Sequence, residues 1–299
     1  MPFTLIKGTF RVVGLSPDGD SIRFVPDDDA LVRALPGGSS GAKPSRQLRL
    51  DGIDALETHY NARHQPSRWA FAATDAILAF AGVKNVVWDS RHATVVAADD
   101  GTRGWILARQ KEKYNRPVAF LFAGEAPDVD GASVTLDAAL LRRSFNLQAL
   151  HQGLAYPTFY ATLFADLRTA MTAAAVDART AKRGLWQEDR TTAGFEATSL
   201  GVLMDEVPIL PKLFRRLSDY MAASGTAVGF KEALAEGRDV VWDLRTQQRT
   251  HLDTFVEQAS GSVQIRLTRD PEELVFDEMP LQPPGFFAAL VGAPLPSGA

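Results

Sequence analysis

The stretch from Arg49 to Glu57 reads Arg-Leu-Asp-Gly-Ile-Asp-Ala-Leu-Glu. Polar and apolar residues alternate from Gln47 to Ile53, which predicts a strand with one buried face. The carboxylates of Asp54 and Glu57 follow Arg49 by five and eight positions, where this strand ends. By itself, such a group of charges is typical of a solvated strand end.

Two other short patterns flank this stretch. Asp18-Gly19-Asp20-Ser21 separates two β-rich runs and alone predicts only a tight turn. Lys113-Tyr114-Asn115-Arg116 precedes a strand-like run, Val118–Phe122, and alone is typical of a basic surface loop. The order and internal spacing of all three patterns carry more information than any one of them.

Together the three patterns resemble the staphylococcal nuclease (thermonuclease) family. That family has Asp-Gly-Asp-Thr after its first strand, then Arg-x-x-x-x-Asp-x-x-Glu, then Lys-Tyr-Gly-Arg before a strand. The similarity continues at Asn146–Ala155 and Gly184–Asp189 and covers about residues 3–190. It implies an α+β fold, a small antiparallel OB-type β-barrel with three helices.

The resemblance also implies a calcium site. Asp20 and Asp54 would be carboxylate ligands, and the backbone carbonyl of Ala55 would supply a further oxygen. Oxygen donors alone suit Ca²⁺ or Mg²⁺ and do not suit zinc. Glu57, beside the metal, would be the general base that activates the attacking water.

Four further residues would meet the nucleic acid, again by resemblance. Arg49 and Arg116 would hold the phosphodiester with their planar forks and stabilise the charge that grows on its oxygens. Lys113 and Tyr114 would contact a neighbouring phosphate. The implied reaction is cleavage at the 5′ oxygen–phosphorus bond, which leaves 3′-phosphate ends.

The chain departs from the family pattern in several places. Ala55 and Leu56 stand where the family usually has Thr-Pro, which keeps the carbonyl ligand but removes the preset turn. Arg103, before a glycine and a strand, competes with Arg116 for the role of second phosphate arginine. The family's nucleotide-contacting tyrosine aligns with Phe159, so the adjacent Tyr160 is the better candidate for substrate binding.

The remaining pattern within residues 1–192 predicts strands first and helices later. Helices are expected at Pro66–Ala81, Leu136–Gln152 and Phe164–Lys182, and an insertion at Asp27–Arg46 lengthens one connection. This order favours an α+β domain built on a small barrel.

A polar, aperiodic stretch near Thr191–Ser199 predicts a domain boundary, followed by an α/β region of unknown fold at 200–299. An amphipathic helix is expected at Leu210–Met221, where Lys212, Arg215 and Arg216 suggest contact with membrane or nucleic acid but packing on the C-terminal region is favoured. A Pro/Gly-rich tail runs from Pro280 to Ala299.

Charge differs between the two parts. Residues 1–192 carry a net charge of +2, with 23 Lys and Arg against 21 Asp and Glu, whereas the remainder carries −6. An acidic unit repels nucleic acid at short range. We therefore expect the C-terminal region to be separate or loosely appended, to contribute no catalytic group, and to bind a protein partner or restrain the nuclease.

Composition excludes several classes of protein. The chain is 299 residues long, 45% hydrophobic and 23% charged, as in ordinary globular proteins. It has no cysteine, which excludes disulfides and thiolate chemistry. The first residues lack the pattern of a secretory signal, and no apolar run is long enough for a membrane span, so a cytoplasmic location is expected.

The sequence thus predicts a calcium-dependent nuclease that acts on DNA, RNA or both. The alternative is a nuclease-like barrel that is catalytically weak or inactive and serves as a nucleic-acid or protein-binding module. Inactive relatives typically lose the metal carboxylates or the arginines. Asp20, Arg49, Asp54, Glu57 and Arg116 are all present, which favours the enzyme.

Overall fold

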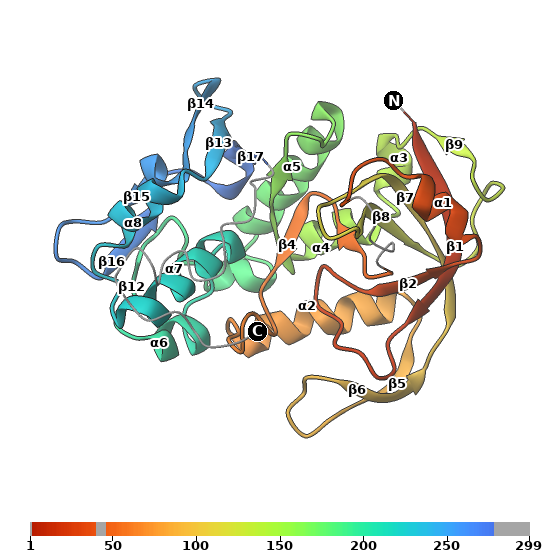
Figure 1. Ribbon diagram of the computed structural model, residues 1–299, viewed down its shortest axis with the longest axis horizontal. Helices are drawn as coiled ribbons and strands as arrows, with labels where there is room; N and C mark the ends of the chain where they lie inside the picture. Colours follow the sequence, from red (N-terminus) through yellow and green to blue (C-terminus); the bar gives the residue numbers. More distant parts are fainter. Residues whose placement is uncertain (1, 40–45, 278–299) are drawn as a thin grey trace.

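The N-terminal part folds around a curled mixed sheet, shown at the right of Figure 1 in a computed structural model that describes residues 2–39 and 46–277. Its strands pair in the order β2-β1-β7-β8-β3, and β9 also pairs with β1. Their bounds are β1 Phe3–Arg11, β2 Arg23–Pro26, β3 Arg49–Leu50, β7 Thr102–Lys111, β8 Pro117–Ala123 and β9 Ser133–Val134. The pairings are antiparallel except that of β3 with β8, which is parallel.

Backbone hydrogen bonds join the two edges of this sheet. Leu48 donates to the carbonyl of Ile22 at 2.9 Å, and Leu50 donates to the carbonyl of Asp20 at 3.1 Å. The curl therefore places the turn that carries Asp20 beside the strand that carries Arg49. The expected α+β class is confirmed.

The helices of this part agree with the sequence in two of three places. Helix α2 spans Ser67–Phe80 and α5 spans Ala165–Thr180, but the helix expected at Leu136–Gln152 is broken into α3, Ala138–Leu141, and α4, Phe145–Gln152. The break arises because the Ser144 side chain caps α4 by accepting from the amide of Leu147 at 3.2 Å.

The sequence predicted three helices in this part. The structure has two further short helices: α3, and α1 (Asp29–Ala34), which lies in the insertion. Among the helices of residues 2–39 and 46–277, none combines the length and apolar composition needed to cross a membrane.

The strand expected at Gln47–Ile53 is also interrupted, and the interruption shapes the site. It separates β3 from β4, Ile53–Ala55, which pairs with β10, Ala155–Pro157. Gly52 has a φ of +76°, and a Cβ there would lie 2.5 Å from the Met171 methyl. The buried Asn146 amide then holds the turn by donating to the carbonyl of Asp51 at 2.9 Å.

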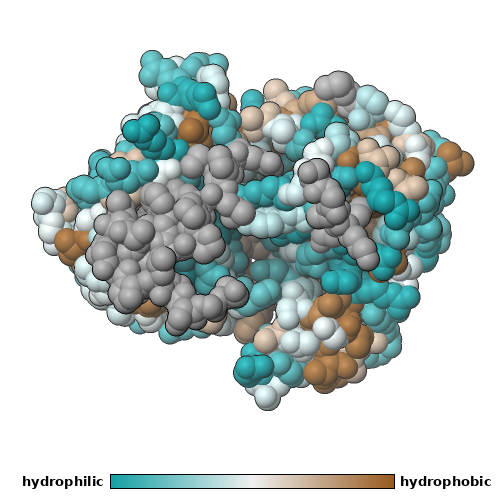
Figure 2. All heavy atoms as spheres, in the orientation of Figure 1, coloured by the Kyte–Doolittle hydropathy of each residue, from teal (hydrophilic) through white to brown (hydrophobic). Residues whose placement is uncertain are grey.

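A hairpin of β5, Lys84–Trp88, and β6, Val95–Asp99, extends from the barrel. Val87 and Val96 on it are about half exposed, at 51% and 53%. Figure 2 shows hydrophobic surface gathered over this hairpin at the lower right.

Short helices and strands make up the C-terminal part, at the left of Figure 1. Its two sheets have the strand orders β11-β17-β13-β14 and β12-β16-β15. Strand β11, Phe159–Tyr160, and the 3-10 turn η1, Gly184–Gln187, come from residues 1–192, and β11 joins the first of these sheets by pairing with β17. The C-terminal part itself has the helices α6 Leu200–Asp205, α7 Pro211–Ser224 and α8 Phe230–Gly237. Its strands and 3-10 turns are β12 Phe195–Glu196, β13 Val240–Asp243, β14 Gln248–His251, β15 Val256–Glu257, β16 Gln264–Leu267, β17 Leu274–Phe276, η2 Leu252–Phe255 and η3 Pro271–Glu273. The expected helix at 210–221 is confirmed as α7, and the tail from Pro280 lies outside the described residues.

The expectation of a loosely appended C-terminal unit is wrong for residues 200–277. One hydrophobic cluster joins Trp69, Tyr156 and Leu185 of the nuclease-like part to Leu213 and Phe214 of α7. The aperiodic stretch is not a free linker either, because Thr191 is fully buried. The hydrophobic pattern of the sequence predicted no helix or strand there, but tertiary contacts hold the stretch in place.

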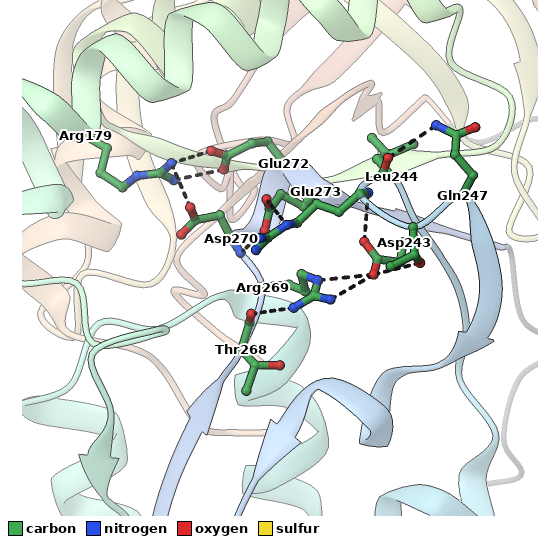
Figure 3. A network of polar contacts seen from close by, with 11 residues as sticks. Arg179, Asp243, Leu244, Gln247, Thr268, Arg269, Asp270, Glu272 and Glu273 are labelled. Carbon is green, nitrogen blue, oxygen red and sulfur yellow. Dashed lines mark hydrogen bonds and ion pairs between the residues drawn. The ribbon is translucent and has the colours of Figure 1, made fainter.

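Ion pairs strengthen this attachment (Figure 3). Arg179 of α5 donates to Glu272 at 2.9 Å and to Asp270 at 3.2 Å, which ties the last helix of the nuclease-like part to η3. Within the C-terminal part, Arg269 donates to Asp243 at 3.1 Å. Both regions therefore fold around shared contacts.

Truncation after Gly194 tests this shared core. It exposes side chains such as Tyr156 and Leu185, each of which contributes about 1.5–3 kcal/mol when buried. We expect the truncated chain to be insoluble or to unfold at a clearly lower temperature than the full chain, measured by circular dichroism. A truncated chain with the thermal stability of the full chain would contradict the shared core.

Candidate active site

Three elements bring acidic side chains together. Asp18 and Asp20 lie in the turn before β2, Asp54 lies on β4, and Glu57 follows β4. A carboxylate oxygen of Asp20 accepts a hydrogen bond from the amide of Ala55 at 3.3 Å. The sequence prediction that Asp20, Asp54 and Glu57 share one site agrees with this arrangement.

Gly19 makes this approach possible. A Cβ at this position would lie 2.5 Å from the Cβ of Ala73 on α2 and 2.7 Å from the Cβ of Ala55 on β4. Any side chain would push the turn away from both elements. The Asp-Gly-Asp pattern therefore has a packing reason in this fold as well as a chemical one.

The carboxylates repel one another. Burial, followed by the charges of Asp54, Asp18 and Glu57, raises the pKa of Asp20 well above its ordinary value, and Arg215 opposes this shift. Burial and the charge of Glu57 raise the pKa of Asp18 to about 7. An excess of negative charge in one small volume favours binding of a cation.

Arg49 stands beside this cluster and against Tyr160. Its guanidinium carbon lies 4.4 Å from the centre of the Tyr160 ring. Burial acts to lower the pKa of Arg49, but Tyr160 and Asp54 outweigh burial and the net shift is upward, so the side chain stays charged. Phe159 is fully buried in the core, so Tyr160 is the aromatic residue that faces the site.

Lys212 of α7 completes the surroundings of Tyr160. Its ammonium lies 5.4 Å from the centre of the Tyr160 ring. Burial acts to raise the pKa of Tyr160, but the charges of Lys212 and Arg49 outweigh it and lower the pKa to about 8. Burial also lowers the pKa of Lys212 itself.

The basic loop, Lys113 to Arg116, lies directly before strand β8. Since Arg49 is the register partner of Val118, the loop ending at Arg116 lies close to β3. The Nε of Arg116 pairs with the buried carboxylate of Glu112 at 3.2 Å, and its guanidinium lies 5.8 Å from the ring of Tyr114. In this conformation Arg116 is thus engaged by its own loop rather than by the carboxylate cluster.

Lys113 and Tyr114 belong to the same loop. The Lys113 ammonium lies 5.4 Å from the Tyr114 ring, and Tyr114 is 52% exposed. Asn115 has a φ of +62°, the conformation that the family's glycine adopts easily and that asparagine tolerates.

The competing arginine has a different partner. Arg103 donates two hydrogen bonds of 2.8 Å to the carboxylate of Asp27, and both residues are largely exposed. It lies on β7 opposite Thr9 of β1. In this arrangement Arg103 is thus paired with a residue of the insertion.

Arg215 of α7 enters the carboxylate cluster, which sequence reasoning missed. Its fork donates to both oxygens of Asp54, at 3.1 Å and 2.7 Å, and it also pairs closely with Glu57. The C-terminal region, which was expected to contribute no catalytic group, thus places a charged side chain against Asp54 and Glu57. The only signal in the sequence was the basic character of the helix at 210–221.

The donor set fits a hard cation in its chemistry but not in its present arrangement. Asp20, Asp54 and the carbonyl of Ala55 are oxygen donors of the kind that Ca²⁺ prefers. Among the residues that the structure describes, however, no three His, Asp or Glu side chains are gathered as a metal site. In this arrangement Arg215 holds Asp54 and Glu57.

The fold and this site define a nuclease-like α+β domain. Residues 47–188 match the family model described as staphylococcal nuclease homologue, so this part of the chain is a staphylococcal-nuclease-like domain. The resemblance inferred from the three patterns is confirmed over these residues, which include Arg49, Asp54, Glu57 and Arg116; α7 lies beyond them. No curated protein matches the chain.

The titration of Tyr160 tests the electrostatics of the site. We expect a phenolate to appear with a midpoint near pH 8, measured by ultraviolet absorbance, because Lys212 and Arg49 stabilise its negative charge. Lys212→Met should raise the midpoint by about one unit or more, since one of the two positive charges is lost. Tyr160→Phe should remove the transition, and Tyr114→Phe should retain it. An unchanged midpoint in folded Lys212→Met would contradict the assignment.

Proposed function

We propose that this protein hydrolyses phosphodiester bonds of DNA or RNA in a calcium-dependent reaction. The observation that carries the proposal is the position of Arg49 beside Asp54, whose partner Arg215 also holds Glu57. A cation for the phosphate and a carboxylate base are thus available at one site. Membership of residues 47–188 in the nuclease family supports the same conclusion.

Each residue has a role in this proposal. Asp20, Asp54 and the carbonyl of Ala55 would hold Ca²⁺, which when bound would supply positive charge to polarise the phosphodiester. Glu57 would accept a proton from water while the water oxygen forms a bond to phosphorus. The bond from phosphorus to the 5′ oxygen would break, and that oxygen would take a proton from solvent.

The arginines and the aromatic residues would hold the nucleic acid. Arg49 would donate to the phosphate oxygens as their charge grows, and Arg116 would exchange Glu112 for the same phosphate. Lys113 and Tyr114 would contact the neighbouring phosphate. Tyr160 would contact the nucleotide, since its ring lies against Arg49.

The second candidate is a nucleic-acid-binding module with weak or no activity. One observation favours it: Arg215 pairs with Glu57, and a carboxylate held by a guanidinium is a poorer base. A protein partner, if the C-terminal region has one, would use surface other than the face of α7 that packs on the site.

Cleavage assays test the proposal directly. Labelled single- and double-stranded DNA and RNA should be cut with Ca²⁺ and left intact with chelator, with 3′-phosphate ends on the products. Glu57→Gln and Arg49→Ala should each lower turnover by about 10²-fold or more, because each removes a base or a transition-state contact. Arg103→Ala is the matched arginine control and should keep full activity.

Two results would count against the enzyme. Cleavage at full rate in chelator would exclude the calcium mechanism. Tight binding of nucleic acid with Ca²⁺, but without any cleavage, would favour the binding module instead.

A further inference from the structure

One face of α7 is directed at the candidate active site. Lys212, Arg215 and Asp219 are spaced by three and four residues, so they lie on the same side of the helix. Lys212 meets Tyr160, Arg215 meets Asp54 and Glu57, and Asp219 accepts a 2.6 Å hydrogen bond from the hydroxyl of Tyr60. Each side chain thus contacts a different segment of the site.

Arg215 makes the most direct of these contacts. Its side chain is 20% exposed and those of Asp54 and Glu57 are 10% and 14% exposed, so the ion pairs are shielded from water. A bidentate guanidinium–carboxylate pair is among the strongest charge-assisted contacts in proteins. Arg215 therefore already contacts both oxygens of Asp54, which would bind a metal, and the carboxylate of Glu57, which would accept a proton.

The acidic cluster can bind a cation of higher charge than a guanidinium. The cluster contains four carboxyl groups, those of Asp18, Asp20, Asp54 and Glu57, and faces two guanidinium groups, those of Arg49 and Arg215. A divalent cation would bring twice the charge to the same oxygens. Two cations that contact the same carboxylate repel each other, so binding of either one opposes binding of the other.

We propose that Arg215 is a built-in competitor for the divalent cation, and that it holds the site in a metal-free, non-hydrolysing state until the cation displaces it. The inference rests on the proposed calcium-dependent function and adds the regulation of that site. The displaced group is the side chain rather than the helix. Leu213, Phe214 and Leu217 of α7 are fully buried, which anchors the backbone, whereas the arginine side chain has several rotatable bonds.

Calorimetric titration of Ca²⁺ into the full-length protein tests this competition. Arg215→Met keeps most of the apolar stem and removes the charge. We expect its affinity for Ca²⁺ to exceed that of the unaltered protein by about 10-fold or more, because a competing positive charge within contact distance is gone. The Ca²⁺ concentration for half-maximal cleavage should fall in parallel.

Arg142→Met is the matched control, since it removes the same charge from an exposed position at the end of α3. Its affinity should equal that of the unaltered protein. Arg215→Lys provides a second variant that keeps a charge but loses the fork, and it should give an intermediate affinity. Circular dichroism checks that each variant is folded.

The outcomes separate the two proposals. Equal or weaker Ca²⁺ binding in folded Arg215→Met or Arg215→Lys, with binding still measurable in the unaltered protein, overturns the competition and leaves the calcium-dependent function standing. Failure of every variant to bind Ca²⁺ overturns both.

Discussion

The pairing of Arg215 with Asp54 and Glu57 is the constraint that connects the two halves of this protein. Acidic side chains from the turn before β2 and from β4 converge because the sheet curls and its edges meet. Their mutual repulsion must be offset by positive charge, and the structure supplies that charge from a helix more than 150 residues away along the chain. The stability of the site and its chemistry therefore depend on the same contact.

This contact needs a rigid support, and the shared hydrophobic cluster provides it. Tyr156 of β10 is register partner to Asp54 and packs in the same cluster as Phe214 of α7. The apolar face of α7 thus fixes the helix, while its polar face meets the carboxylates. An amphipathic helix usually turns its polar face to water; here part of that face is covered by the nuclease-like domain.

Local patterns predicted which carboxylates lie together because much of this geometry is local. Asp54 and Glu57 follow Arg49 within nine residues, so strand and turn geometry alone place them close together. The Asp-Gly-Asp turn joins them because hydrogen bonds link the two edges of the sheet, which the family resemblance implied. The roles of Arg116, Lys113 and Tyr114 remain predictions, since their loop is engaged with Glu112 and with itself. The sequence did not predict the break between α3 and α4, because a single cap by the Ser144 side chain is enough to end one helix and begin another.

By itself the sequence determined the α+β class and the nuclease-like domain, and it predicted the residues that are proposed to carry its chemistry. These features follow from hydrophobic periodicity and from motifs whose members lie close together in the chain. Only the tertiary structure decided that residues 200–277 share a core with that domain and that Arg215 reaches Asp54. Periodicity shows which face of a helix is apolar, but not which surface covers it. The net charge of the C-terminal part led to a wrong expectation for the same reason. This part is acidic on average, but the position of one side chain, Arg215, brings a positive charge to the carboxylates.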